Sequence, residues 1–370
     1  MLKTSLYLIV IFLVGLFIFK FTNNNSANNR ITLQNWAKNK ILSETAYFQS
    51  HHFSKKDVDK TYNDLSAIND NMLIRFQIVD GKVSSNATDT SNPHIIKASN
   101  SFHKFFDHLV KQYPLDQNVY FIISISDTLS IPDNYTPTAP IIVPSKYTNS
   151  PYAQFLLLAP HYKTVSEWPK IYDDILATNP HYPWEHKVEK AFWRGGFTTS
   201  SLTRSNWQDS AINKLLTLSS QNPALIDAEI TNISSRDVET QSLLAQKYPL
   251  AVNASMLEYT KYKINIKMDD QTAIYPGFLS MLLASCVVLK EQSTREQWFY
   301  DILEENKHYI SFSNDLSDLL PKIQWIYDND SEARLIADAG RSIIQKEITP
   351  EHLLLYWRSV LESYATMYIQ

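Results

Sequence analysis

Residues 261–290, KYKINIKMDDQTAIYPGFLSMLLASCVVLK, contain two short apolar runs separated by a helical pattern. Residues 262–267 and 286–290 have the length and composition of strands that are buried on both faces. Residues 276–285, between them, are predicted to form a helix. A strand, a helix and a second strand in this order are typical of parallel strands joined by a crossover connection. This stretch therefore predicts a parallel sheet with helices on both faces.

The same alternation extends along the chain in both directions. Further strands are predicted at 119–125, 140–143, 191–194, 225–230 and 309–312, and a hairpin is predicted over 73–83 with its turn at Asp80-Gly81. Further helices are predicted at 101–112, 206–219, 235–247, 295–303, 315–327, 331–345 and 350–367. Two such α/β units in tandem predict two Rossmann-like domains with a cleft between them. In parallel sheets, ligands bind at the carboxyl ends of the strands.

The bulk composition excludes several classes of protein. The chain has 370 residues and only 6 glycines, and it contains no P-loop, no G-x-G-x-x-G fingerprint and no G-x-S-x-G nucleophile elbow. A net charge of -4 offers no basic surface, so we expect no nucleic-acid partner. Cys286 is the only cysteine, so no intrachain disulfide can form. The length favours two domains, because one core rarely serves more than about 250–300 residues.

The amino-terminal residues predict a membrane anchor. Leu6 to Phe19 is an almost unbroken apolar segment between Lys3 and Lys20, at the short end of what spans a bilayer. A cleaved signal peptide is the alternative, but no small-x-small cleavage site follows. We therefore expect an uncleaved single-pass anchor at 1–21 and a polar, low-complexity linker at 22–32.

The orientation of this anchor is predicted from charge. More lysines and arginines follow the apolar segment than precede it, which favours a cytoplasmic body at a bacterial inner membrane by the positive-inside rule. N-glycosylation sequons occur at 86–88 and 253–255, so a location in the lumen of the Golgi or the endoplasmic reticulum is the alternative.

Two places next to predicted strands carry residues suited to chemistry. Asp127 directly follows the strand at 119–125, where a carboxylate can act as a general base or can cap the next turn. Arg194 and the glycines after it end another predicted strand, and the loop that follows contains hydroxyl side chains and Arg204. This combination suits phosphate binding, and a solvated surface loop is the alternative.

No metal site is predicted. The sequence Asp328-Asn329-Asp330 spells the D-x-D of metal-dependent sugar transferases, but it precedes a helical pattern, so Asp330 or Ser331 is expected to cap that helix. The 10 histidines show no clustered ligand spacing. Cys286 lies within an apolar strand and is expected to pack as a small hydrophobic residue.

Several motifs, in their order along the chain, resemble those of glycosyltransferase family 90 over roughly residues 70–368. This family includes capsule-associated and lipopolysaccharide-modifying transferases and protein O-glucosyl- and O-xylosyltransferases. The most specific motif is PWEHKVEKAFWRG at 183–195, followed by Thr198 and Arg204. The later matches are NPALIDA at 222–228, KYKINI at 261–266, VVLK at 287–290 and DLSDL at 315–319.

The resemblance implies an α/β fold of the GT-B type, in which two Rossmann-like domains face a cleft. On this expectation, 33–185 form the acceptor-side domain and 186–345 form the domain that binds the nucleotide sugar. Residues 346–370 would form a helix that packs back on the body. The resemblance also implies no cofactor and no obligatory metal.

The resemblance also assigns roles to residues. Asp127 matches the carboxylate that deprotonates the acceptor hydroxyl. Arg194 matches the arginine that contacts the donor, where positive charge offsets the charge that develops on the leaving diphosphate. The other residues expected to bind the donor are Trp193, Gly195, Thr198, Arg204, Thr272, Ala273, Tyr275 and Glu296.

One position departs from the family pattern. The family shows a segment like T-A-S-[YF]-R, whose arginine contacts the diphosphate, whereas residues 271–277 read QTAIYPG, with Pro276 at the position of the arginine. Lys267, Arg204 or Arg295 could supply the missing charge, or the helix N-terminus that begins at Pro276 could hold the phosphates. Altered donor choice and lost activity are the remaining alternatives.

The sequence therefore predicts an inverting, metal-independent transferase that moves a glucose- or xylose-type sugar from a UDP-sugar to a hydroxyl acceptor. The expected acceptor is a glycan or lipid-linked glycan of lipopolysaccharide or capsule, and the amino-terminal helix is expected to contact the membrane. Two alternatives stay open. One is a family member that binds a glycan or a nucleotide without turnover, which Pro276 suggests; the other is a Golgi or endoplasmic-reticulum transferase that acts on protein.

Overall fold

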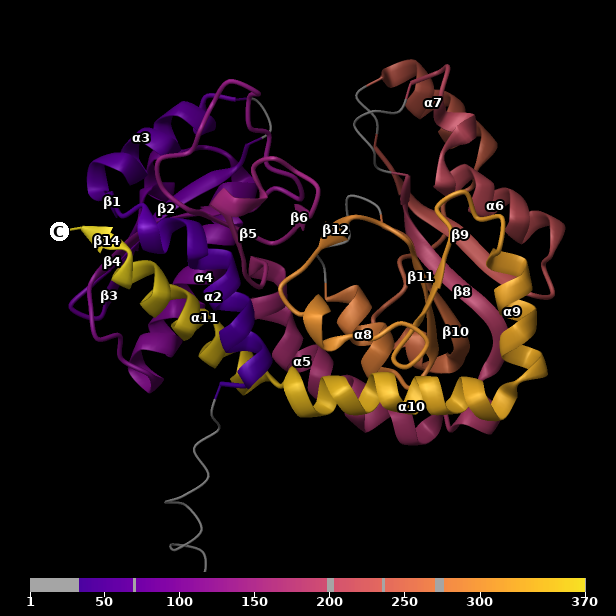
Figure 1. Cartoon of the computed structure of the whole chain (residues 1–370). Coiled ribbons are helices and arrows are strands. Elements are labelled where there is room, and N and C mark those ends of the chain that lie inside the picture. The colour runs from indigo at the N-terminus through magenta and orange to yellow at the C-terminus, as the bar shows by residue number, and fades with distance from the viewer. Residues whose placement is uncertain (1–32, 69–70, 198–202, 235–236, 270–275, 370) are drawn as a thin grey trace, which may run out of the picture. The chain divides into compact units, whose positions relative to one another are not determined.

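A computed structural model describes residues 33–68, 71–197, 203–234, 237–269 and 276–369. Residues Gln34–Gln370 form one compact unit. This unit contains two five-stranded sheets with helices around them, so the fold is mixed α/β with Rossmann-like sheets. In Figure 1 the first sheet lies in the indigo and magenta part of the chain, and the second lies in the rose and orange part.

The first sheet has the strand order β3-β2-β4-β5-β7. Strand β2 is antiparallel to both β3 and β4, whereas β4, β5 and β7 run parallel to one another. The parallel half therefore directs the carboxyl ends of three strands to one edge. The strands are β2 (Leu73–Val79), β3 (Lys82–Ser85), β4 (Val119–Ser124), β5 (Ile141–Val143) and β7 (Leu156–Leu158).

The predicted hairpin is confirmed. Val79 pairs with Lys82 across the turn, and both turn residues have positive φ angles, 50° at Asp80 and 71° at Gly81. A type I′ turn requires positive φ at both central residues, which is why an Asp-Gly pair is favoured there.

Within the described ranges, four helices contact strands of the first sheet and a fifth packs on two of these helices. The helix predicted at 101–112 begins eight residues earlier, at Pro93, where the side chain of Asn92 accepts a hydrogen bond from the backbone of His94. Proline at the first helical position and asparagine at the N-cap together fix this start. The helices are α2 (Asn35–Ser50), α3 (Lys55–Ser66), α4 (Pro93–Gln112), α5 (Tyr162–Thr178) and α11 (Pro350–Thr366).

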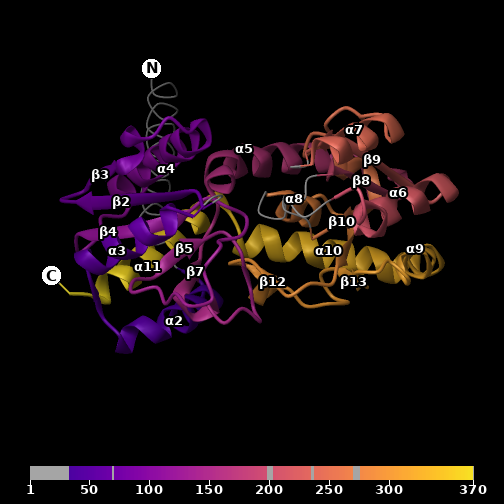
Figure 2. The same ribbon diagram turned by 90° about the horizontal axis from the view of Figure 1, so that it is seen from above.

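Helix α11 returns from the end of the chain to the first sheet, where it contacts α2 and β4. The Tyr364 hydroxyl donates a hydrogen bond to the carbonyl of Pro140, and the Tyr356 hydroxyl donates to that of Leu158. After α11, strand β14 (Tyr368–Ile369) pairs in parallel with β1 (Phe53–Ser54). Figure 2 shows α11 in yellow beside the indigo and magenta strands.

The second sheet is entirely parallel, as predicted, and has the order β13-β11-β10-β8-β9. Counted from the other edge, the strands follow the chain order 2-1-3-4-5, so the direction of the connections reverses between β8 and β10. Such a switch point leaves a crevice at the carboxyl ends of the two strands. The strands are β8 (Val188–Phe197), β9 (Ile226–Ile233), β10 (Tyr262–Lys267), β11 (Val287–Glu291) and β13 (Ile310–Phe312).

Five further helices accompany the second sheet. A core of buried apolar residues joins the strands to these helices, and Ile264, Val287 and Leu289 at its centre are fully buried. Helix α10 packs so closely that a Cβ at Gly340 would lie 2.7 Å from the carbonyl oxygen of His308. The helices are α6 (Ala211–Gln221), α7 (Val238–Lys247), α8 (Gly277–Leu283), α9 (Leu319–Asp328) and α10 (Asp330–Glu347).

The helix predicted at 295–303 is wrong. Strand β12 (Arg295–Glu296) pairs there with β6 (Lys146–Tyr147) in the antiparallel sense, and a short 3-10 turn follows at Tyr300–Ile302. The apolar spacing reflects burial of Trp298 and Phe299 in an irregular segment. Burial of an aromatic residue does not require a helix, so the pattern was ambiguous.

The D-x-D segment belongs to a helix start, one residue away from the prediction. Asn329 occupies the N-cap position, and Asp330 is the first residue of α10. The Asp330 carboxylate accepts hydrogen bonds from Lys263 Nζ at 2.8 Å and from Trp184 Nε1 at 3.0 Å. Among the described residues, no group of three or more His, Cys, Asp or Glu side chains could hold a metal ion.

The predicted anchor at 1–21 and the predicted linker at 22–32 lie outside the described residues. None of the helices within the described ranges combines the length and apolarity needed to cross a bilayer. The predicted domain boundaries stay predictions.

Candidate functional site

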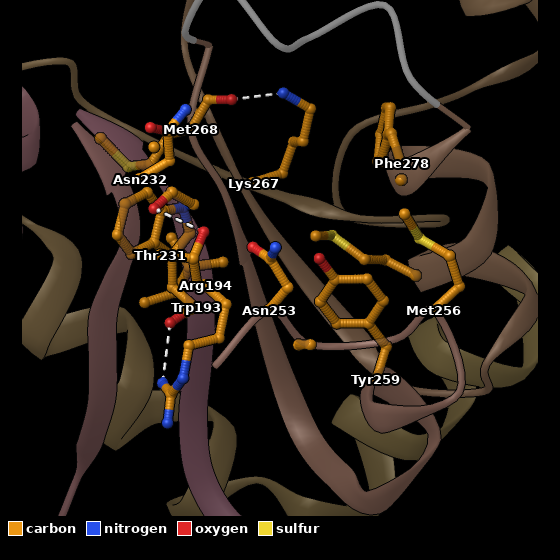
Figure 3. A pocket seen from close by; sticks show the side chains of 16 residues that line it. Trp193, Arg194, Thr231, Asn232, Asn253, Met256, Tyr259, Lys267, Met268 and Phe278 are labelled. Carbon is orange, nitrogen blue, oxygen red and sulfur yellow. Dashed lines mark hydrogen bonds between the residues drawn. The ribbon is translucent and has the colours of Figure 1, made fainter. Parts of the chain in front are cut away.

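A cavity of about 660 Å³ opens at the switch point of the second sheet. Figure 3 shows its lining side chains, which come from the carboxyl ends of β8, β9 and β10, from the segment before β10 and from α8. This is the position at which a parallel sheet of this order binds its ligand. The lining residues are Trp193–Gly196, Thr231, Asn232, Asn253, Ala254, Met256, Tyr259, Ile266–Met268, Gly277, Phe278 and Met281.

The lining combines apolar and hydrogen-bonding side chains. Met256, Tyr259 and Phe278 provide aromatic and thioether surface on one side in Figure 3. Asn232 and Asn253 add amide donors and acceptors. Polar groups placed beside apolar surface are typical of sites for small molecules, and the volume lies in the usual range of about 300–1,000 Å³.

Lys267 supplies the cavity with a positive charge. It is the last residue of β10 and is 7% exposed, and its ammonium donates a hydrogen bond to the carbonyl of Met268. Its register partner on β11 is Lys290, a second buried lysine. Burial lowers the pKa of Lys290, the charge of Asp269 opposes this, and Lys267 lowers it further. Lys267 is thus a cation of the cavity lining that can attract an anionic ligand.

Arg194 lines the cavity, but its guanidinium is bound elsewhere. Nη2 lies 2.7 Å from Asp227 Oδ1 and 2.8 Å from Glu229 Oε2, and Nη1 donates to the carbonyls of Trp193 and Asp227. In Figure 3 the guanidinium points away from the ammonium of Lys267. Both carboxylates come from β9, the neighbouring strand. The predicted contact of Arg194 with the donor diphosphate stays a prediction, and it requires the guanidinium to leave these partners.

The other predicted residues on β8 lie in the cavity wall. A Cβ at Gly195 would lie 2.4 Å from Cζ2 of Trp193, so glycine allows the indole to fold back over the strand. Trp193 and Gly195 both line the cavity, and their contact with a donor stays a prediction. Pro276 is the N-cap of α8 and precedes Gly277 and Phe278, which also line the cavity.

Four predicted donor-binding residues lie outside the described residues: Thr198, Thr272, Ala273 and Tyr275.

Two predicted donor-binding residues lie outside the described lining of the cavity. Arg204 is exposed and pairs with Glu239 at 3.2 Å. Glu296, on β12, instead forms an ion pair with Lys40 of α2, which also lies 3.4 Å from Glu44 and Asp301. Burial lowers the pKa of Lys40, but the hydrogen bond with Glu296 and the neighbouring carboxylates raise it above its ordinary value. Lys40 therefore stays charged within this cluster.

Asp127 is the third residue after the end of β4. It is half-buried, and its carbonyl accepts a hydrogen bond of 2.8 Å from the Ser145 hydroxyl. Burial lowers the pKa of Lys163 at the start of α5, and the charge of Asp127 opposes that shift. Burial and the charge of Asp127 both raise the pKa of Tyr162. Tyr162 and Lys163 at the start of α5 thus lie within the electrostatic reach of the Asp127 carboxylate, and Ser145 fixes its backbone.

Arg295 of β12 reaches this region from the second half of the chain. Its Nη2 donates to the Tyr147 hydroxyl at 2.8 Å and lies 3.4 Å from Oγ1 of Thr128, the residue after Asp127. Its Nε lies 4.0 Å from Asp269 Oδ2, two residues after the end of β10. Burial lowers the pKa of Arg295, but Tyr147, Asp269 and Asp127 together raise it. Arg295 therefore joins the surroundings of Asp127 to the end of β10.

His161, next to this site, predicts a pH dependence of stability. The ring is 5% exposed and caps α5 by accepting from the Lys163 backbone, and burial followed by the charge of Lys163 lowers its pKa from 6.5 to about 3. Above pH 6.5 both the folded and the unfolded chain hold it neutral, whereas below that pH only the unfolded chain takes up the proton. The free energy of unfolding should then fall by about 1.4 kcal/mol per pH unit, or about 2 kcal/mol between pH 6.5 and 5.

The matched variant for this measurement is His161→Asn, which keeps a capping side chain and cannot be protonated. Urea unfolding at several pH values should give a shallower pH slope for the variant than for the wild type. Parallel slopes for the two proteins would contradict the assignment to His161.

Sequence reasoning missed most of the cavity lining. Asn232 lies at the end of β9, so the rule for parallel strands could have selected it, whereas Lys267 at the end of β10 was already among the cations considered for the diphosphate. Asn253 and Met256 come from an irregular segment whose one motif, the N-glycosylation sequon at 253–255, predicts no ligand site. No local signal pointed to that segment, because only the tertiary fold brings it to β10.

Comparison with known proteins identifies the family. The sequence model described as Glycosyl transferase family 90 matches residues 146–369. Protein O-glucosyltransferase 2 of Danio rerio is 35% identical over 189 residues, which are 50% of this chain and 34% of that protein. Protein O-glucosyltransferase 3 of Homo sapiens is 32% identical over 182 residues, which are 49% of this chain and 33% of that protein. The matched region thus spans about a third of the length of these two relatives.

A longer sequence match and two distantly similar solved structures complete the comparison. Protein O-glucosyltransferase 1 of Rattus norvegicus is 25% identical over 273 residues, covering 70% of this chain and 65% of that protein. The structure of HepE from Anabaena in complex with UDP and glucose has a TM-score of 0.39 at 12% identity, covering 61% of this chain and 63% of HepE. A glycosyltransferase from Rickettsia africae has a TM-score of 0.39 at 11% identity, covering 75% and 83%. Since the family match covers more than half of the residues, the chain belongs to glycosyl transferase family 90.

Proposed function

We propose that the protein transfers a sugar from a UDP-sugar to a hydroxyl acceptor, with inversion and without a metal ion or other cofactor. The observation that carries this proposal is the cavity at the switch point between β8 and β10. Its aromatic and thioether surface suits a nucleobase, and Lys267 at its edge suits a phosphate. The names of the relatives support a glucose-type donor, and a xylose-type donor is the nearest alternative.

In this reaction Asp127 takes the proton from the acceptor hydroxyl. The acceptor oxygen forms a bond to the anomeric carbon, the bond from that carbon to the diphosphate breaks, and UDP leaves with the electron pair. Attack from the face opposite the leaving group inverts the anomeric carbon. The arrangement is of the GT-B type in this proposal, with Asp127 supplied by the first sheet and the donor held by the second.

The acceptor has two candidates. We propose a glycan or lipid-linked glycan of lipopolysaccharide or capsule, reached by a body on the cytoplasmic side of a bacterial membrane with residues 1–21 as an anchor. The names of the curated relatives, protein O-glucosyltransferases, favour a protein hydroxyl in the Golgi or endoplasmic-reticulum lumen as the second candidate. Transfer of radiolabelled sugar to each acceptor class, with and without EDTA, distinguishes the two and tests metal independence.

Filling the cavity is expected to block the donor. Ala254 lines the cavity and is half-buried, whereas the next residue, Ser255, is exposed and is absent from the lining. Ala254→Phe should weaken UDP binding by about tenfold or more, because a bound ligand of this size needs most of the cavity and each tenfold corresponds to about 1.4 kcal/mol. Ser255→Phe adds the same ring one residue away and should leave the affinity for UDP unchanged.

Isothermal titration of UDP into the full chain measures both variants. Equal affinities for the wild type and Ala254→Phe would place the donor elsewhere. Binding of UDP without release of UDP from any of a panel of UDP-sugars would instead support the non-catalytic family member that Pro276 suggests.

A further inference from the structure

Arg295 has a buried guanidinium that its surroundings satisfy only in part. Its side chain is 5% exposed, and Nη2 is bound by the hydroxyl of Tyr147. Within the described part of the chain, Nε and Nη1 have no hydrogen-bond partner. The 4.0 Å from Nε to the carboxylate of Asp269 is too long for a hydrogen bond. Two buried nitrogens of a cation thus have no acceptor, which is costly unless a ligand supplies one.

The position of Arg295 connects the cavity to Asp127. Its neighbour Asp269 directly follows Met268, which lines the cavity. Its other neighbour, Thr128, directly follows Asp127. A donor with its nucleotide in the cavity and its anomeric carbon facing Asp127 therefore brings its diphosphate past Arg295.

The other cations considered from the sequence are less suited to the phosphate that carries the sugar. Arg204 is 72% exposed and pairs with Glu239. Arg194 is held by Asp227 and Glu229. Lys267 lies at the cavity itself, where the nucleotide side of the donor is expected. Helix α8, which begins after Pro276, has only 7 residues, so its N-terminus offers no anion site.

We propose that Arg295 binds the donor diphosphate at the phosphate that carries the sugar, and so supplies the charge that Pro276 cannot. This inference rests on the proposed function. As the bond to the anomeric carbon breaks, the electron pair moves to the oxygen that joined this carbon to the phosphate. Nε and Nη1 lie on different edges of the planar guanidinium, so their free N–H groups can reach two separate oxygens of the diphosphate. The proton released by the acceptor goes to Asp127, so Arg295 acts only on the leaving group.

The test compares three probes, UDP, UMP and inorganic pyrophosphate, by isothermal titration of the full chain. Arg295→Gln should weaken UDP binding by about 10–100-fold, the usual value of a charged hydrogen-bonding group. It should weaken pyrophosphate binding similarly and change UMP binding by less than about threefold, because UMP lacks the second phosphate. Arg295→Lys should give an intermediate loss, since lysine keeps the charge without the planar fork.

Arg334→Gln is the matched control, because Arg334 is 49% exposed and pairs with Glu185 far from β12 in the sequence. It should leave all three affinities unchanged. The melting temperature of each variant is measured alongside, and if Arg295→Gln is unfolded at the assay temperature, Arg295→Lys decides between the outcomes. Selective loss of UDP and pyrophosphate over UMP is a result that a purely structural role does not produce.

The remaining outcomes of the titrations bear either on the role of Arg295 or on the proposed function. Unchanged UDP binding by Arg295→Gln, equal loss of UDP and UMP, or a selective loss seen only in Arg204→Gln would overturn the role of Arg295. A wild type that binds pyrophosphate but not UDP would overturn the proposed function, and loss of that pyrophosphate binding in Arg295→Gln would still support the anion site. A wild type that binds neither probe would overturn both.

Discussion

Asp127→Asn is expected to lower the rate of sugar transfer by about 10²–10⁴-fold, the usual contribution of a general base. The amide keeps the size and much of the hydrogen bonding of the carboxylate but cannot take the acceptor proton. The backbone contact with Ser145 involves the Asp127 carbonyl and stays in place. The affinity for UDP should therefore change little, and the loss should appear in kcat.

Asp133→Asn is the matched control for this prediction. Asp133 belongs to the same irregular segment after β4, and it is exposed. Its replacement by Asn removes the same charge and should leave transfer near the wild-type rate. Transfer by Asp127→Asn within about tenfold of the wild type would remove Asp127 from the role of base, since a base is worth more than that.

Lys40→Met is expected to destabilise the fold by about 3–5 kcal/mol, the usual cost of breaking a buried ion pair from one side. Lys40 of α2 is 5% exposed and pairs with Glu296, Glu44 and Asp301. Glu44 keeps a second partner, Lys146 at 2.6 Å. The methionine therefore leaves the Glu296 carboxylate, 18% exposed, with the largest uncompensated charge.

Urea unfolding followed by tryptophan fluorescence measures this loss. Adding Glu296→Gln to Lys40→Met should restore part of the stability, because the buried negative charge is then removed as well. Lys60→Met is the control, since Lys60 is 56% exposed and pairs with Asp64 at 2.5 Å, and such exposed pairs contribute about 1 kcal/mol or less. A loss of the same size for Lys40→Met and Lys60→Met would show that burial adds nothing to this cluster.

The Lys40 cluster also bears on the proposed diphosphate site. Glu296 is adjacent to Arg295 on β12, and β12 has only two residues, which pair with β6. The ion pair with Lys40 is one of the contacts that hold this short strand in place. Lys40→Met is therefore expected to loosen the position of Arg295 in addition to lowering stability.

The second sheet could be predicted well because its signals are local. Buried parallel strands such as β10 and β11 are continuous apolar runs, and the helix between them has its own pattern, so a window of about ten residues identifies each element. The segment at 295–303 could not be assigned in this way. Its strand β12 forms through pairing with Lys146–Tyr147, and a pattern within the segment carries no information about a partner so distant.

The candidate site could be predicted only where it follows strand ends. Trp193, Arg194 and Gly195 lie in the cavity wall because the carboxyl end of β8 is there. The ion pairs of Arg194 with β9 depend on the register of the two strands, in which Arg194 faces Glu229. Register is a property of the assembled sheet, so the sequence of β8 alone could not reveal that the guanidinium is bound there.

The sequence by itself determined the strand–helix alternation, the family and the position of Pro276 where the family has an arginine. Each of these is written in neighbouring residues, whose polarity and identity can be read directly. The tertiary structure decided which distant groups meet: it brings Lys40 to Glu296, 256 residues away, and Arg295 to Thr128, 167 residues away. Such contacts depend on how the two sheets and their connections pack, because burial and charge compensation act through space and leave no local pattern in the chain.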